Sequence, residues 1–435
     1  MRAPWIGIAF GLAIFTAAAC NGENSAELPA APEAAADEPD ALVKAELALG
    51  YAAKADEKEI AAAQTALGES PDSIEAHLAL ATAFVRRGRA TSQAVYATYA
   101  RDVIAAARSI DANDHRLRTL STMLLLDEHK FEAAAAAATE LVAAQPDDPT
   151  PKLLLGDAKL ELGDYDDAID AYQQAVDLHP DLRSYNRGAF LRWLQGDFDG
   201  AVKVMELALQ AGSMRDAESM AWCFVDLGAM YLHRGDAKRA QAAADRALTL
   251  VRDYVPAKVL AARAHALQGD TRKAVEELEA AVARRPNAED FLRLVELHEE
   301  LGDAEAAAHA RAEAETLTPN DPRPMAHFLA RRNESPEEAL RLAKAELETR
   351  HNLWSHDTLA LALLRAGQPA EAKRAIEKAL AWNTPDATFH LHAALVDAAL
   401  EDPASARKHL EAALALDRTV DPRLVAELRS KLGDA

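Results

Sequence analysis

The chain has 435 residues, half of them apolar but only 5% aromatic, and its 70 acidic and 48 basic side chains give a net charge of −22. This charge repels phosphate backbones and anionic lipid headgroups, which argues against nucleic acid as a partner. It favours a basic protein or segment, unless the acidity serves only solubility. Much of the apolar count is alanine, which suits closely packed helices, so we expect an all-α protein.

Residues 1–19 have the layout of a secretory signal peptide, with an early cation, an apolar run from Ile6 to Phe15 and small residues before Cys20. The run is shorter than the ~20 residues of a membrane span, which argues against an uncleaved anchor. The stretch TAAAC resembles the lipobox of bacterial lipoproteins, and this resemblance implies that Cys20 is acylated. Ala17 replaces the usual Leu, and Ala17 with Ala19 would also suit ordinary signal cleavage.

Residues 20–40 are rich in Ala, Pro and Glu and lack a helical period, which predicts a flexible, lipid-anchored tether. Asn21, rather than Asp, follows Cys20, and by resemblance to enteric sorting rules this favours the outer membrane. We expect a location in the bacterial cell envelope, facing the periplasm. Cys223 is the only other cysteine, so no disulfide framework is available, and we expect a small buried filler rather than a reactive thiol.

Five Gly-Asp pairs recur along the middle of the chain, at intervals of 33 to 39 residues. Their glycines are Gly163, Gly196, Gly235, Gly269 and Gly302. Gly367 holds the same place without the Asp, and Gly88 is a weaker match. An Ala follows five residues after each of the five glycines, in a series that extends from Ala134 to Ala406, and several of these alanines are followed twelve residues later by Pro.

Each of these recurring residues, Gly, Asp, Ala and Pro, predicts one part of a helical hairpin. Gly accepts the left-handed conformation that ends a first helix, and the Asp after it can cap the second helix. The Ala allows the two backbones to approach where they cross, and the Pro ends the second helix. We therefore expect an N-terminal helix over 41–72, a repeat array over 73–420 and a capping helix over 421–435.

These units resemble tetratricopeptide repeats (TPR), whose period is about 34 residues. The resemblance is strongest in the units Pro149–Leu182 and Ala221–Tyr254. In the first unit the matching residues are Leu155, Gly156, Gly163, Ala168, Tyr172, Ala175 and Pro180. His129 and Glu401 stand where other units have the turn glycine. The resemblance implies a right-handed α-solenoid of about ten helix-turn-helix units, with a concave groove that receives peptides or extended protein segments.

The family pattern assigns certain first-helix positions to the groove, and in the middle of the array these carry Arg, Asn and aromatic residues. We expect a peptide-binding patch at Arg183, Asn186, Phe190, Trp193 and Trp222. The alternative is that Trp193 and Trp222 only pack between helices. The Lys/Asn/Arg carboxylate clamp of some family members is not evident, because Leu153 and Asp157 occupy its first positions.

Glu289, Glu296 and Glu299 occupy groove positions further along, where they could bind a basic segment or simply form a solvated face. No phosphate-binding loop, dinucleotide fingerprint or nucleophile elbow occurs in the sequence. His298 has no second histidine four residues on, and His390 and His392 point in different directions on a helix. We expect no catalytic residue, no cofactor, no metal and no small-molecule substrate.

The sequence therefore predicts a non-catalytic protein-protein interaction scaffold or assembly factor of the bacterial cell envelope. Its partner would be another protein or a peptide segment held in the groove, with the membrane reached through the N-terminal lipid. The alternative is a periplasmic chaperone-like module that holds an unfolded client protein before maturation. The two differ in ligand, since a client should bind as a short isolated peptide whereas a folded partner needs a shaped surface.

Overall fold

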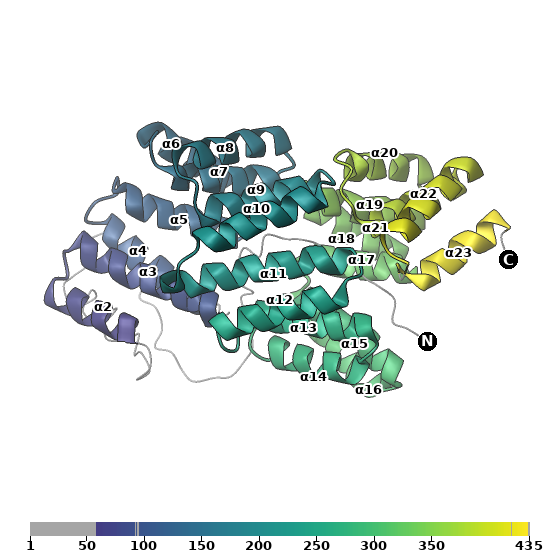
Figure 1. The fold of residues 1–435 in the computed structure, drawn as a ribbon, viewed down its shortest axis with the longest axis horizontal. Coiled ribbons are helices and arrows are strands. Elements are labelled where there is room, and N and C mark those ends of the chain that lie inside the picture. Colours follow the sequence, from purple (N-terminus) through teal and green to yellow (C-terminus); the bar gives the residue numbers. More distant parts are fainter. Residues whose placement is uncertain (1–57, 92, 94, 419, 434–435) are drawn as a thin grey trace.

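The computed structural model describes residues 58–91, 93, 95–418 and 420–433, which fold into twenty-two α-helices and one short 3-10 helix, η1 (Met214–Asp216) (Figure 1). The fold is an all-α, right-handed solenoid, as the sequence predicts. The predicted signal peptide, Cys20 and the tether lie outside the described residues. None of the described helices combines the length and the apolar character needed to cross a membrane.

Twenty of the helices form ten antiparallel hairpins, which we number 1 to 10. The pairs are α3 (Ile74–Thr91) with α4 (Val95–Arg108), α5 (His115–Asp127) with α6 (Phe131–Ala144), α7 (Pro149–Glu161) with α8 (Tyr165–Leu178), α9 (Leu182–Leu194) with α10 (Phe198–Ala211), α11 (Ala217–His233) with α12 (Ala237–Leu250), α13 (Val255–Gln268) with α14 (Thr271–Val282), α15 (Ala288–Leu301) with α16 (Ala304–Leu317), α17 (Pro322–Arg332) with α18 (Pro336–Glu346), α19 (Leu353–Arg365) with α20 (Pro369–Leu380) and α21 (Ala387–Ala399) with α22 (Pro403–Leu416). Before them lies α2 (Lys58–Glu69), and after them α23 (Pro422–Leu432) packs against α21.

The turns of hairpins 2 to 10 each contain a residue with a left-handed backbone conformation. All six predicted turn glycines from Gly163 to Gly367 have positive φ. His129 and Glu401, which replace glycine in two turns, also have positive φ, at 57° and 61°. Gly88 differs, because it lies inside α3 rather than in a turn, so the weak match at this position was wrong.

The Asp after the turn glycine caps the second helix in four of the five Gly-Asp units. Its side chain accepts a hydrogen bond from a free backbone N–H of the helix that follows, which satisfies a donor that the helix itself cannot. Asp164 is the exception, because its carboxylate pairs with Lys159 at 2.9 Å and caps no N–H group. The cap predicted for Asp164 was therefore wrong.

The recurring alanines and prolines also have the structural roles that the sequence predicts. The nine alanines of the series from Ala134 to Ala406 are each at most 6% exposed, at the contact between the two helices of a hairpin. Pro146 and Pro180 follow closely after the ends of α6 and α8. First helices of successive hairpins contact one another along much of the array, and we call the surface that they share the inner face.

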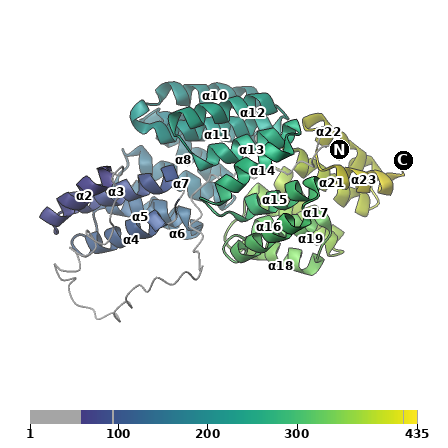
Figure 2. The ribbon, with the colours of Figure 1, turned by 90° about the horizontal axis from the view of Figure 1, so that it is seen from below.

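The superhelix also contacts itself across one turn, so that hairpins 3 and 4 meet the segments that precede α19 and α21 (Figures 1 and 2). The Tyr165 hydroxyl accepts a hydrogen bond from the backbone N–H of Leu353 at 2.8 Å. The Thr384 hydroxyl donates to the carbonyl of Leu194, also at 2.8 Å, although the two residues are 190 positions apart. We call this contact between turns the seam.

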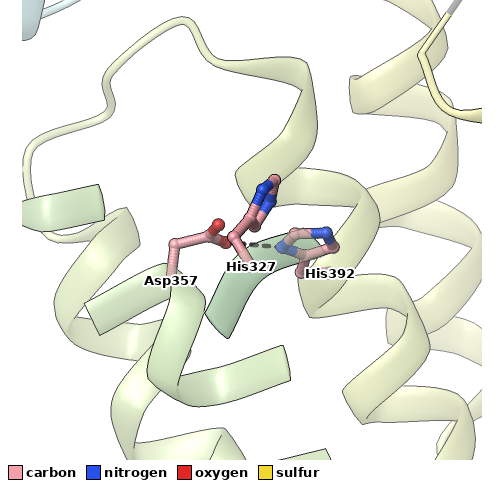
Figure 3. Close-up of side chains that lie close together, drawn as sticks. All are labelled: His327, Asp357 and His392. Carbon is pink, nitrogen blue, oxygen red and sulfur yellow. Dashed lines mark hydrogen bonds and ion pairs between the residues drawn. The ribbon is translucent and has the colours of Figure 1, made fainter. Parts of the chain in front are cut away.

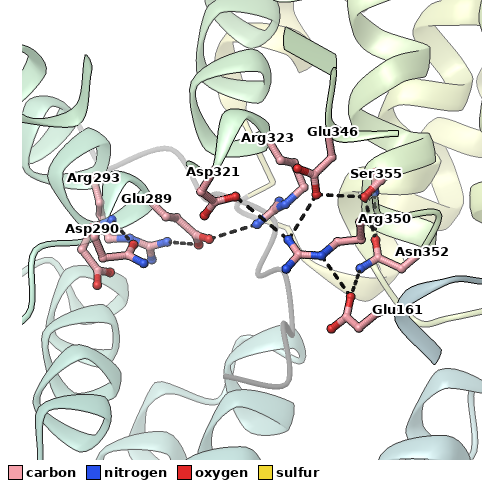
Figure 4. A network of polar contacts seen from close by, with 11 residues as sticks. Glu161, Glu289, Asp290, Arg293, Asp321, Arg323, Glu346, Arg350, Asn352 and Ser355 are labelled. Carbon is pink, nitrogen blue, oxygen red and sulfur yellow. Dashed lines mark hydrogen bonds and ion pairs between the residues drawn. The ribbon is translucent and has the colours of Figure 1, made fainter. Parts of the chain in front are cut away.

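Buried charges hold the centre of the seam (Figure 4). The Glu161 carboxylate accepts a hydrogen bond from the side-chain amide of Asn352 at 2.8 Å and pairs with Arg350 at 3.1 Å. Arg350 also pairs with Glu346 at 3.1 Å. Because the two carboxylates are at most 4% exposed, their charges depend on Arg350 for compensation.

Alanine at Gly163 should destabilise the protein more than alanine at Gly235. Both glycines have left-handed φ angles, which cost an alanine about 1 kcal/mol. A β-carbon at Gly163 would also lie 2.5 Å from the carbonyl oxygen of His351 across the seam, whereas nothing lies within 4 Å at Gly235. Urea unfolding should show that Gly163→Ala lowers the free energy of unfolding by about 1–3 kcal/mol more than Gly235→Ala does. An equal loss of stability in the two variants would mean that the seam contact at Gly163 adds nothing to stability.

Candidate functional site

A cavity of about 180 Å³ lies on the inner face of hairpins 2 to 6. Its walls come from the first helices α5, α7, α9, α11 and α13, together with Arg89 of α3 and Arg285, which follows α14. Three of the five predicted groove residues, Arg183, Asn186 and Trp222, line this cavity. The inner face therefore brings predicted residues from hairpins 4 and 5 into one site.

The cavity has both an apolar and a charged lining. Leu153, Leu182 and Trp222 contribute apolar surface from three consecutive first helices. Arg187 binds Asp157 in two-pronged fashion, through Nε at 2.6 Å and Nη2 at 2.5 Å. The Tyr172 hydroxyl donates to the same carboxylate at 2.7 Å. Asp157 is thus compensated within the protein, and this part of the wall is held in one geometry.

Other arginines of the cavity are less fully compensated. The Nε of Arg285 is buried and has no hydrogen-bond partner in the described structure. The Arg183 side chain is 47% exposed, and its Nε and Nη2 atoms donate at 3.2 Å to Asp181, the residue that caps its own helix. On the acidic side, Glu218 accepts a hydrogen bond from Tyr254 at 2.7 Å, and burial raises the pKa of Glu218. The site therefore has donors available for an incoming carboxylate.

A buried polar group supports the cavity from behind. The Asn186 side-chain amide donates to Asp226 of α11 at 2.7 Å. Burial raises the pKa of Asp226 to about 7, against the opposing effects of Asn186 and Arg187. Asp226 thus fixes Asn186 while carrying only part of a charge at neutral pH.

We expect Asp226→Asn to stabilise the protein increasingly as the pH rises. The folded protein holds the Asp226 proton more tightly than the unfolded chain, so wild-type stability falls as the pH rises from about 4 through 7. The advantage of Asp226→Asn should grow by roughly 2–3 kcal/mol between pH 5 and pH 8 in urea unfolding. Asp199→Asn, on the exposed side of α10, is the control. A variant that is less stable than wild type at pH 8 would contradict this expectation.

Phe190 and Trp193, the other two predicted groove residues, lie outside the cavity and inside the seam. Trp193 is fully buried and Phe190 is 4% exposed. Both rings stack with Trp354 of α19, at centroid distances of 6.3 Å and 6.5 Å. The repeat pattern assigns these two aromatics to the groove, because it contains no information about contacts between turns of the superhelix.

The predicted acidic stretch is compensated by arginines. Glu289 pairs with Arg293 and with Arg323, as Figure 4 shows. Glu296 pairs with Arg331, and Glu299 pairs with Arg332. Each of these glutamates has at least one partner on α17, the first helix of the next hairpin. The three glutamates therefore link hairpins 7 and 8 and do not form an open acidic surface.

Several cavity residues were not found from the sequence. Arg89 and Arg285 lie at or beyond helix ends, and Glu218 lies near the start of α11, just after η1. The family's groove positions do not include these places, so the repeat pattern gave no signal for them. Cys223 is fully buried, and burial raises the pKa of its thiol, as expected for an unreactive filler.

A sequence model of the tetratricopeptide repeat family matches residues 123–183, 153–216, 259–322 and 358–435, which together are more than half of the chain. The chain belongs to the tetratricopeptide repeat family. Its hairpin turns, buried alanines and inner face are those of TPR units. No curated protein matches the chain in sequence.

Solved structures similar to this TPR protein include PilW, described as a widely conserved type IV pilus biogenesis factor (21% identity, 48% of this chain, 94% of that chain, TM-score 0.39). Others are PilF of Pseudomonas aeruginosa (16% identity, 47% and 92%, TM-score 0.38) and a human IFIT1 dimer with PPP-AAAA (16% identity, 79% and 90%, TM-score 0.48). At these identities and TM-scores the likeness extends to the helical-repeat architecture and not to ligands or partners.

Proposed function

We propose that this TPR protein is a non-catalytic interaction scaffold or assembly factor that binds a protein segment in the inner-face cavity. The observation that carries the proposal is the cavity itself, which combines apolar surface on three first helices with arginine donors that the protein does not fully use. Repeat solenoids bind extended ligands on such concave surfaces. The net charge of −22 supports a protein ligand over a nucleic acid.

The chemistry of the cavity defines the segment that it would hold. An aromatic or aliphatic side chain would pack against Trp222 and Leu153, and a nearby carboxylate would bind Arg183 or Arg285. Asn186 is held by Asp226 and has little freedom to turn toward a ligand, so its part is to fix the wall. Phe190 and Trp193 support the site by holding α9 against α19.

The proposal includes a location in the bacterial cell envelope. The signal-like residues 1–19, the lipobox-like stretch before Cys20 and the tether to residue 40 support a lipid-anchored protein that faces the periplasm, with the outer membrane favoured. Fractionation of cells that express wild type or Cys20→Ala tests this part separately. Loss of the protein from the membrane fraction of the variant supports acylation, and unchanged membrane association contradicts it.

Selection from a displayed peptide library tests the binding site. We expect wild type to enrich peptides with a large apolar residue beside Asp or Glu, and Arg183→Glu/Trp222→Ala to bind them at least tenfold more weakly. Arg341→Glu is the matched control, because Arg341 is an exposed arginine on the second helix α18. Equal binding by all three proteins would place the ligand outside the cavity.

A crosslinking pull-down from the native host distinguishes an interaction scaffold from a chaperone-like module. One folded protein captured by wild type, and lost with Arg183→Glu/Trp222→Ala, supports a scaffold. Capture of many unfolded chains through the same cavity supports the chaperone-like alternative. Associations that survive the cavity variant but disappear with Cys20→Ala would show that location alone brings the proteins together.

A further inference from the structure

Three polar side chains from consecutive first helices meet near the C-terminal end of the array. His327 of α17, Asp357 of α19 and His392 of α21 each place a nitrogen or oxygen atom within 4.8 Å of the others (Figure 3). Their residues are 9%, 3% and 0% exposed, respectively. Because the cluster is largely buried, its polar atoms need partners within the protein or a bound ion.

The pair of His392 and Asp357 is only partly satisfied. His392 Nδ1 lies 2.8 Å from Asp357 Oδ1, at hydrogen-bond distance. The other ring nitrogen, Nε2, is buried and has no hydrogen-bond partner in the described structure. Buried polar atoms rarely remain in this state, so Nε2 of His392 is available to a bound ion.

His327 is suited to act as a neutral ligand. Its ring lies 5.7 Å from the His392 ring, at an interplanar angle of 57°. Arg331, one turn further along α17, is a positive charge beside this ring, and the neutral imidazole is the form that binds metals. Arg331 is itself compensated, because it pairs with Glu296 at 3.1 Å and with Asp421 at 2.8 Å.

We propose that His327, Asp357 and His392 bind a divalent transition metal of the zinc class. Two imidazoles and one carboxylate suit Zn²⁺ and its neighbours, whereas Ca²⁺ and Mg²⁺ require mainly oxygen ligands. Zinc bonds of about 2.0–2.2 Å place ligand atoms about 3.3 Å apart, so small side-chain rotations close the present 4.8 Å. The ion would tie hairpins 8, 9 and 10 together and leave its fourth position for water.

The test is zinc binding by the full chain after treatment with EDTA. We expect calorimetry to find one Zn²⁺ per chain at a site that His327→Ala and Asp357→Asn weaken at least a hundredfold. Thermal unfolding should shift upward by several degrees with Zn²⁺ in wild type and not in these variants. Co²⁺ should give the visible absorption of a four-coordinate site in wild type but not in His327→Ala or Asp357→Asn.

His390→Ala/His409→Ala is the matched control, because these two histidines also pair, with their Nδ1 atoms 3.1 Å apart, but lie outside the proposed ligand set. The control should keep the zinc affinity and the thermal shift of wild type. Circular dichroism identifies any variant that fails to fold, and His327→Gln then takes the place of His327→Ala. Absence of a stoichiometric zinc site in wild type, or a site that persists in the His327 variants, overturns the proposal.

Discussion

Arg350→Met is expected to lower the free energy of unfolding by about 3–5 kcal/mol. The Arg350 guanidinium pairs with Glu161 across the seam and with Glu346 of its own hairpin, each at 3.1 Å. Without it, two carboxylates that are 1% and 4% exposed would lose their main cation. Such unpaired buried charges cost far more than the pair itself contributes. Urea unfolding at pH 8 measures the loss.

Two further measurements assign that loss to the buried charges. The destabilisation should be smaller at pH 5, because burial already raises the pKa of Glu161 and Glu346 and protonation removes the unpaired charges. Adding Glu161→Gln to Arg350→Met should recover part of the stability. Arg341→Met is the control, because its ion pair with Glu338 is exposed, and no measurable change is expected there. A loss that is equal at both pH values would contradict the electrostatic explanation.

Trp193→Ala is expected to cost about 3–5 kcal/mol, the usual loss for a buried tryptophan. The indole is fully buried and contacts one aromatic ring on its own helix and one on each of two other helices. Its ring partners are Phe190, His233 and Trp354. Because Trp354 belongs to α19, the substitution removes packing across the seam as well as within hairpin 4.

Trp222→Ala provides the contrast to Trp193→Ala. Trp222 is only partly buried and lines the cavity, so its removal should weaken ligand binding at a much smaller cost in stability. Chemical unfolding and binding of a selected peptide, measured on both variants, separate the two roles. If Trp193→Ala left stability nearly unchanged and abolished binding, Trp193 would be a ligand contact rather than a packing residue.

The sequence predicts the hairpins well because each structural part of a repeat has its own residue. Left-handed turns need glycine or a tolerated substitute, close helix crossings need alanine, and these requirements recur at a nearly constant interval. Even the exceptions follow this reasoning, since His129 and Glu401 adopt the turn conformation at the places that the interval assigns. Gly88 fails because a glycine can also lie inside a helix, as it does in α3.

The seam and the histidine cluster could not be predicted in this way. Tyr165 and Leu353 meet only because the superhelix has a particular pitch, which depends on small angles between hairpins that no single residue specifies. For the same reason, the sequence places His392 next to His390, whereas its partners in space come from two other hairpins. Three of the predicted residues line the cavity, and the repeat pattern does not distinguish them from the two aromatics that face another turn.

The seam also restricts how the number of repeats can change. In an open solenoid each repeat touches only its neighbours, so a unit can be gained or lost at little structural cost. Here the residues of hairpins 3 and 4 must meet specific residues before α19 and α21, and the hairpins between them set that distance. Deleting one whole unit inside this closed circuit would displace every seam contact at once, whereas the repeats outside it are free to vary in number.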